Sequence, residues 1–151
     1  MNTKTKIFFI QVVSMLLMFM FSYTAINKLL NRQSFRITMS VSPLISNFAT
    51  LLSWLIPLIE ITIVALLFFK KSRTAGLLAS AGLMVSFTIY IGYMFLFVPE
   101  RPCSCGGILS AMSWSQHFVF NIFFSALAFT AYYLLSHKRF IAINRTSRTP
   151  V

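Results

Sequence analysis

Four long apolar runs, separated by short groups of basic residues, constrain the fold of this chain more than any other feature. The runs extend over about residues 7–26, 44–69, 75–98 and 115–135. Each has the length of about 20 residues that an α-helix needs to cross roughly 30 Å of hydrocarbon. Because lipid offers no water to pair with the backbone, each run must satisfy its own hydrogen bonds as a helix. The sequence therefore predicts an all-α membrane protein with a single domain over residues 1–151, a four-transmembrane-helix bundle.

The composition indicates which surroundings the chain is built for. It is 58% hydrophobic and 10% charged, whereas a water-soluble domain carries about 25% charged residues. The net charge of +11 is a feature that nucleic-acid-binding proteins share. Here, however, the basic residues stand between apolar runs, and no groove-reading motif accompanies them. We therefore expect the lipid bilayer to be their partner, and no nucleic acid.

The distribution of basic residues predicts the orientation of the bundle. Nine of the 13 Lys and Arg residues stand in the N-terminal segment, the second loop and the C-terminal tail, and four stand in the first and third loops. Cytoplasmic loops carry the excess of Lys and Arg in membrane proteins. We therefore expect a multi-pass membrane protein with both termini cytoplasmic and with the first and third loops on the opposite side of the membrane.

The first run follows Lys4 and Lys6, as the apolar core of a signal peptide would. It is longer than such a core usually is, and no clean small-x-small cleavage site follows it. We therefore interpret it as a retained transmembrane helix.

The two cysteines of the chain, Cys103 and Cys105, stand in the stretch RPCSCGG in the third loop. Thiols in an oxidising bacterial envelope are normally oxidised, paired or metal-bound. Gly106 and Gly107 would let the backbone bend enough to bring the two sulfurs into bonding distance. A disulfide that closes so small a ring gives little stabilisation, while strained bonds tend to be labile or catalytic. The pattern favours a redox pair and leaves open inert thiols, bonds to another chain and a metal site.

A metal site would need further ligands. Two thiolates together with His117 and Met112 would suit a soft ion such as Cu(I). A structural zinc site normally has four ligands, and the sequence does not show such a set. We therefore assign no metal ligands, and copper handling remains an alternative hypothesis.

Glu60 is one of only two acidic residues and stands deep in the second apolar run. Acidic residues inside a membrane are energetically costly and usually functional. Lys28, at the outer end of the first run, could reach Glu60 by extending its side chain inward, and Tyr90 or Asn121 could donate hydrogen bonds to it. The alternative is an acid that only packs between helices.

His117 and Asn121 are four residues apart at the start of the fourth run, so they share one helix face close to the cysteines. With Cys103 and Cys105, His117 is a candidate catalytic residue, because an imidazole can move protons during thiol exchange. Asn121 and Glu60 are candidate cofactor contacts. The cofactor is not identified by any motif, and a quinone is one that these groups could bind. The alternative for His117 is a histidine at the membrane interface.

Three stretches together carry a family resemblance: SYTAINKLLNRQSFRITMSVSPLI, LIPLIEITIVALLF and PCSCGGILSAMSWSQHFVFNIFF. The sequence resembles the DoxX-like membrane proteins and, within them, the branch of the methylamine utilisation protein MauE. The resemblance implies a four-helix bundle of the bacterial inner membrane that does thiol redox work in the periplasm, often beside a thioredoxin-like partner. It also implies a part in maturing a disulfide-rich amine dehydrogenase subunit, with Cys103 and Cys105 as the redox pair and Glu60 as the family-type acid. The arrangement is also similar to the quinone-linked disulfide oxidases, which use more than one cysteine pair where this chain has one.

Our leading hypothesis is an inner-membrane thiol-disulfide oxidoreductase. Its Cys103/Cys105 pair would exchange disulfides or electrons with a periplasmic thioredoxin-like or client protein. The second hypothesis is a non-catalytic membrane scaffold or accessory subunit of an envelope complex. Small residues of the third run motivate it, because they let helices approach closely: Ala75, Gly76, Ala79, Ser80, Gly82 and Ser86. The third hypothesis is copper handling.

Overall fold

The computed structural model describes residues 2–42, 44–97 and 114–146, and every element in these ranges is helical. The elements are α1 (Thr3–Leu30), α2 (Arg32–Ser40), the 3₁₀ turn η1 (Ser46–Phe48), α3 (Ala49–Phe68), α4 (Arg73–Phe97) and α5 (Trp114–Thr146). Four helical segments are long and apolar enough to cross a membrane: α1, η1 with α3, α4 and the first two thirds of α5. The prediction of an all-α, four-span protein is confirmed, while the side on which the termini lie stays a prediction.

The helices do not end where the hydropathy falls. α1 continues past the predicted end near Ile26 to Leu30, where the Asn31 N–H donates to the Asn27 carbonyl. α5 likewise continues from the predicted end near Leu135 to Thr146. A helix ends where its backbone bonding stops, and this is independent of where the lipid ends. α3 begins at Ala49, five residues later than the predicted start of the second run near Leu44, because the 3₁₀ turn η1 precedes it.

The short helix α2 lies in what we expected to be a plain first loop. Its residues Phe35, Thr38 and Met39 are buried, at the spacing of one helix face. Phe35 and Met39 form a small cluster with Ala49 and Ile56 of α3. α2 therefore packs against the start of α3 and covers one end of the bundle.

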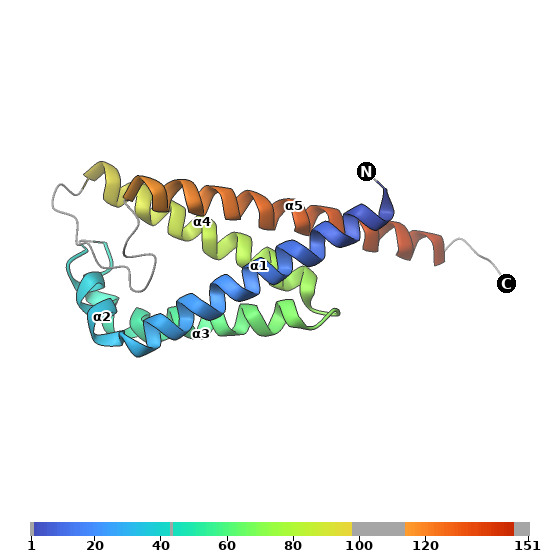
Figure 1. Cartoon of the computed structure of the whole chain (residues 1–151). Coiled ribbons are helices and arrows are strands. Elements are labelled where there is room, and N and C mark those ends of the chain that lie inside the picture. Colours follow the sequence, from blue (N-terminus) through green and yellow to red (C-terminus); the bar gives the residue numbers. More distant parts are fainter. Residues whose placement is uncertain (1, 43, 98–113, 147–151) are drawn as a thin grey trace.

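The bundle consists of two helix pairs, α1 with α3 and α4 with α5 (Figure 1). The start of α1, the α3–α4 turn and the end of α5 lie at one end of the molecule. α2, the end of α4 and the start of α5 lie at the other end, which we call the α2 end (Figure 1). Four consecutive spans place the start of the first helix and the end of the fourth at the same end of a bundle, as seen for α1 and α5 (Figure 1).

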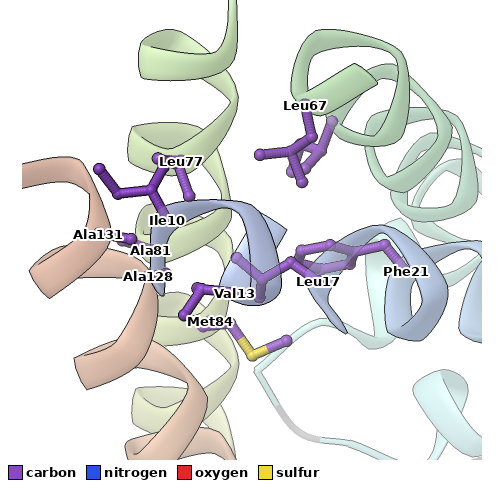
Figure 2. Close-up of a cluster of buried hydrophobic side chains, with 11 residues drawn as sticks. Ile10, Val13, Leu17, Phe21, Leu67, Leu77, Ala81, Met84, Ala128 and Ala131 are labelled. Carbon is purple, nitrogen blue, oxygen red and sulfur yellow. The ribbon is translucent and has the colours of Figure 1, made fainter. Parts of the chain in front are cut away.

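One face of α1 forms the centre of the main core, with buried residues three or four positions apart: Ile10, Val13, Leu17 and Phe21. Figure 2 shows them between Leu67 of α3 and residues of the other pair, namely Leu77, Ala81 and Met84 of α4 and Ala128 and Ala131 of α5. Ala128 and Ala131 are fully buried, and their small side chains let α5 come close to its neighbours.

The small residues of α4 divide into two groups. A Cβ added at Gly76 would lie 2.9 Å from the Leu67 backbone nitrogen, so only glycine fits this approach between α3 and α4. Ser80, one turn later, is fully buried and donates to the Gly76 carbonyl at 2.7 Å. By contrast, a Cβ at Gly82 would meet nothing within 4 Å, and Ser86 is exposed. The predicted packing face is therefore right for Gly76 and Ser80 and wrong for Gly82 and Ser86, which lie on another side of the helix.

Candidate functional site

Glu60 and Lys28 form an ion pair inside the bundle. Glu60 lies in the middle of α3 with 1% of its side chain exposed, and Lys28 lies in the last turn of α1 with 12% exposed. The Lys28 Nζ donates to Glu60 Oε1. Lys28 thus reaches inward as we expected, and each buried charge has an opposite charge beside it.

Two aromatic rings also lie near the Lys28 ammonium. Its Nζ lies 5.7 Å from the centre of the Phe35 ring and 5.2 Å from the centre of the Phe87 ring. A cation at this distance over an aromatic face is attracted by the ring's negative face. α2 supplies Phe35 and α4 supplies Phe87, so the ion pair between α1 and α3 also contacts two further helices.

The second oxygen of the carboxylate is in a different situation. Glu60 Oε2 is buried and has no hydrogen-bond partner among the described residues. The hydroxyl of Thr24, another residue that lines the cavity, donates to the Phe21 carbonyl at 3.2 Å. An acceptor is therefore left without a donor in the interior of the bundle.

His117 and Asn121 also form a pair, in the first two turns of α5. Asn121 is 2% exposed, and its Nδ2 donates to the His117 Nδ1 at 2.8 Å and to the His117 carbonyl at 2.7 Å. Because an amide N–H can only donate, Nδ1 is the acceptor, and the proton of the neutral ring is on Nε2. The two residues share a face as we expected. Asn121 bonds His117, whereas we had considered it as a donor to Glu60.

A cavity of about 340 Å³ connects the two polar pairs. Lys28, Glu60, His117 and Asn121 all line it, and most of the remaining lining is apolar side chains from all five α-helices. Phe35 of α2 belongs to the wall, so the cavity lies toward the α2 end. The structure therefore brings together three of the five residues predicted to form a site, Glu60, His117 and Asn121.

Cys103 and Cys105 lie outside the described residues, as does Met112. The segment that carries them follows the end of α4 and precedes Trp114, the first residue of α5. Both of these helix ends lie at the α2 end, where the cavity is (Figure 1). Within residues 2–42, 44–97 and 114–146, no three His, Cys, Asp or Glu residues group as metal ligands.

Several cavity residues were not identified from the sequence. Phe35 and Phe87 gave no signal, because a phenylalanine is unremarkable in a chain with 17 of them. Thr24 is one turn before Lys28 on α1, and this spacing on one helix face could have pointed to it. The shape of the cavity depends on how the two helix pairs diverge, which no local pattern encodes.

A family model described as methylamine utilisation protein MauE matches residues 6–134. The matched range includes every residue that lines the cavity and both cysteines. No curated protein and no solved structure matches the chain significantly.

Proposed function

Because the chain belongs to the methylamine utilisation protein MauE family, we propose that it is a membrane thiol-disulfide exchange protein of methylamine utilisation. The observation that carries the proposal is the position of the cysteines in the chain. The two cysteines stand in the segment between α4 and α5, whose helix ends lie at the cavity end of the bundle, and His117 is in the first turn of α5. A thiol pair thus adjoins, along the chain, a polar site inside a membrane bundle.

The proposed reaction is a two-step exchange. The thiolate of one cysteine attacks a disulfide of the partner protein, a mixed disulfide forms, and the partner's other sulfur leaves as a thiolate. The second cysteine attacks the mixed disulfide and releases the partner's first sulfur. In total, two electrons and two protons pass to the partner, and a Cys103–Cys105 disulfide forms. The reverse sequence oxidises a partner dithiol.

His117 is the residue we propose for proton transfer. Its Nδ1 accepts from Asn121, so Nε2 is the nitrogen that would exchange protons with a thiol or with water. Asn121 holds the ring from the next turn and is a positioning residue. A histidine in the first turn of α5 is close in sequence to the cysteines that precede this helix.

We further propose that the cysteines face the periplasm and that the partner is a thioredoxin-like or client protein there, such as a disulfide-rich, amine dehydrogenase-like protein. The excess of Lys and Arg in the terminal segments and the second loop supports this orientation in the inner membrane. The family membership supports the link with methylamine utilisation.

The test is to trap the mixed disulfide. Cys103→Ser and Cys105→Ser would be expressed separately, beside Ser104→Ala as the matched control for a change within the same stretch. One of the two cysteine variants lacks the resolving thiol and should accumulate a covalent complex with a periplasmic protein. Dithiothreitol should separate this complex by reducing the mixed disulfide. If neither variant forms such a complex, exchange by these cysteines is excluded. If the variant with both cysteines changed to serine then keeps the function of the native protein, the scaffold hypothesis is favoured.

A further inference from the structure

We propose that the cavity binds a lipid-soluble molecule whose polar end is a hydroxylated aromatic ring, held by Glu60 and Lys28. This goes beyond thiol exchange, because no cysteine takes part in the binding. The cavity lies between segments long and apolar enough to cross a membrane, so a ligand would enter from the hydrocarbon.

The unpartnered carboxylate oxygen defines one requirement for the ligand. Glu60 is 1% exposed, its Oε1 is paired with Lys28, and its Oε2 has no partner within the described ranges. Burying an acceptor without a donor costs about 1–3 kcal/mol, and more when the group is charged. Glu60 lines the cavity while Oε2 itself is buried, so a turn of the carboxylate would bring Oε2 to a ligand there, which could supply the missing donor. The ligand must therefore carry an O–H or N–H group.

Lys28 defines a second requirement. An ammonium has three N–H donors and no acceptor, and one of those of Lys28 goes to Glu60 Oε1. The ligand group next to it must therefore accept a hydrogen bond. A hydroxyl meets both requirements at once, because its oxygen accepts from Lys28 Nζ while its hydrogen is donated to Glu60 Oε2. A carbonyl or an ether can only accept, and an ammonium can only donate.

The lining and the volume favour an aromatic ring as the bearer of this hydroxyl. Four phenylalanines from four helices line the cavity: Phe21, Phe35, Phe87 and Phe120. Aromatic rings contact one another favourably, beyond the area they bury. A volume of about 340 Å³ is more than twice the roughly 150 Å³ that accommodates benzene in a protein interior. A substituted ring with the start of an alkyl tail fits, and a two-chain phospholipid does not.

The test uses two probes that differ only in whether the ring oxygen carries a hydrogen or a methyl group. Dodecylphenol and its methyl ether have the same ring and tail, and the ether cannot donate. Binding to the full chain in lipid nanodiscs would be measured by native mass spectrometry across a concentration series. We expect the phenol to bind at least about tenfold more tightly than the ether, the difference that one hydrogen bond to a charged group makes.

Two variants test whether the preference for the phenol depends on the ion pair. Lys28→Met with Glu60→Leu removes both charges together, so that no buried charge is left alone and the bundle can still fold. In this double variant the phenol and the ether should bind equally. Glu100→Gln removes the other acid of the chain, which lies outside the described residues, and should keep the preference.

Three results would overturn the proposal: no binding of either probe, equal binding of both to the native chain, or a preference that survives in the double variant.

A third probe, dodecylhydroquinone, distinguishes two classes of ligand that both carry a phenolic hydroxyl. Tighter binding than the phenol would identify a diphenol, whose second hydroxyl could reach His117 across the cavity, and equal binding would identify a simple phenol. The readout is binding alone, so it stays separate from the trapping of a mixed disulfide. Cys103→Ser with Cys105→Ser should leave it unchanged.

Discussion

Glu60 and Lys28 depend on each other, because each would be a charge buried without a partner if the other were removed. Their side chains come from different helices, α3 and α1, so the pair fixes how these helices lie against each other. The rings of Phe35 and Phe87 extend the same group to α2 and α4. A single residue pair thus connects four helices at the α2 end.

Removing one partner should therefore be worse than removing both. Lys28→Met leaves Glu60 buried without a counter-charge and should destabilise the bundle by about 3–5 kcal/mol. Lys28→Met with Glu60→Leu replaces the pair by apolar side chains and should restore most of that loss. Thermal unfolding in detergent measures both, with Lys4→Met, at an exposed position of α1, as the control. A double variant less stable than either single variant would mean that the two residues do not interact.

At the scale of elements, the contact between α3 and α4 depends on one glycine. Gly76 is a point of close approach between the two helices soon after the turn, because a Cβ there would lie 2.9 Å from the Leu67 backbone nitrogen. Backbone atoms cannot move aside as the end of a flexible side chain can, so any larger residue must push the helices apart.

We predict that Gly76→Ala lowers the stability of the bundle by about 1–3 kcal/mol, the usual loss from overpacking. Gly82→Ala on the same helix is the matched control, because a Cβ there meets nothing within 4 Å. This control should be neutral or slightly stabilising, since alanine favours a helix over glycine by up to about 1 kcal/mol. Melting temperatures of the two variants, measured in the same detergent, test this prediction. Equal melting temperatures would show that the approach at Gly76 is not tight.

The elements also show how far the sequence could predict this structure. The four spans follow from hydropathy, because a helix in lipid needs a long apolar run. The contact of Lys28 with Glu60 was predictable as well, since a buried acid needs a partner and Lys28 stands at the end of a neighbouring run. α2 was not predicted, because it is polar on average and a search for long apolar runs passes over it. Its buried residues share one helix face, and this amphipathic pattern could have pointed to it. The cavity could not be predicted either, because it arises where the two helix pairs diverge.

At the scale of the whole molecule, polar chemistry is concentrated at one end. The core between the termini and the middle of the bundle consists mainly of apolar side chains (Figure 2), and its buried serines, Ser14 and Ser80, donate to carbonyls of their own helices. The ion pair, the His117–Asn121 pair and the cavity lie toward the α2 end, where α4 ends and α5 begins. The cysteine segment joins those two helices. This asymmetry suits a protein that meets its partner on one side of a membrane only.

The state and accessibility of Cys103 and Cys105 test this account most directly. The chain has no other cysteine, so a membrane-impermeant maleimide added to intact spheroplasts reports on this pair alone. We predict labelling only after mild reduction, because the pair should rest as a disulfide that faces the periplasm. The variant with both cysteines changed to serine controls for labelling of other proteins. If the thiols stay unlabelled after reduction and become labelled only when detergent opens the membrane, the pair does not face the periplasm and the proposed exchange there is wrong.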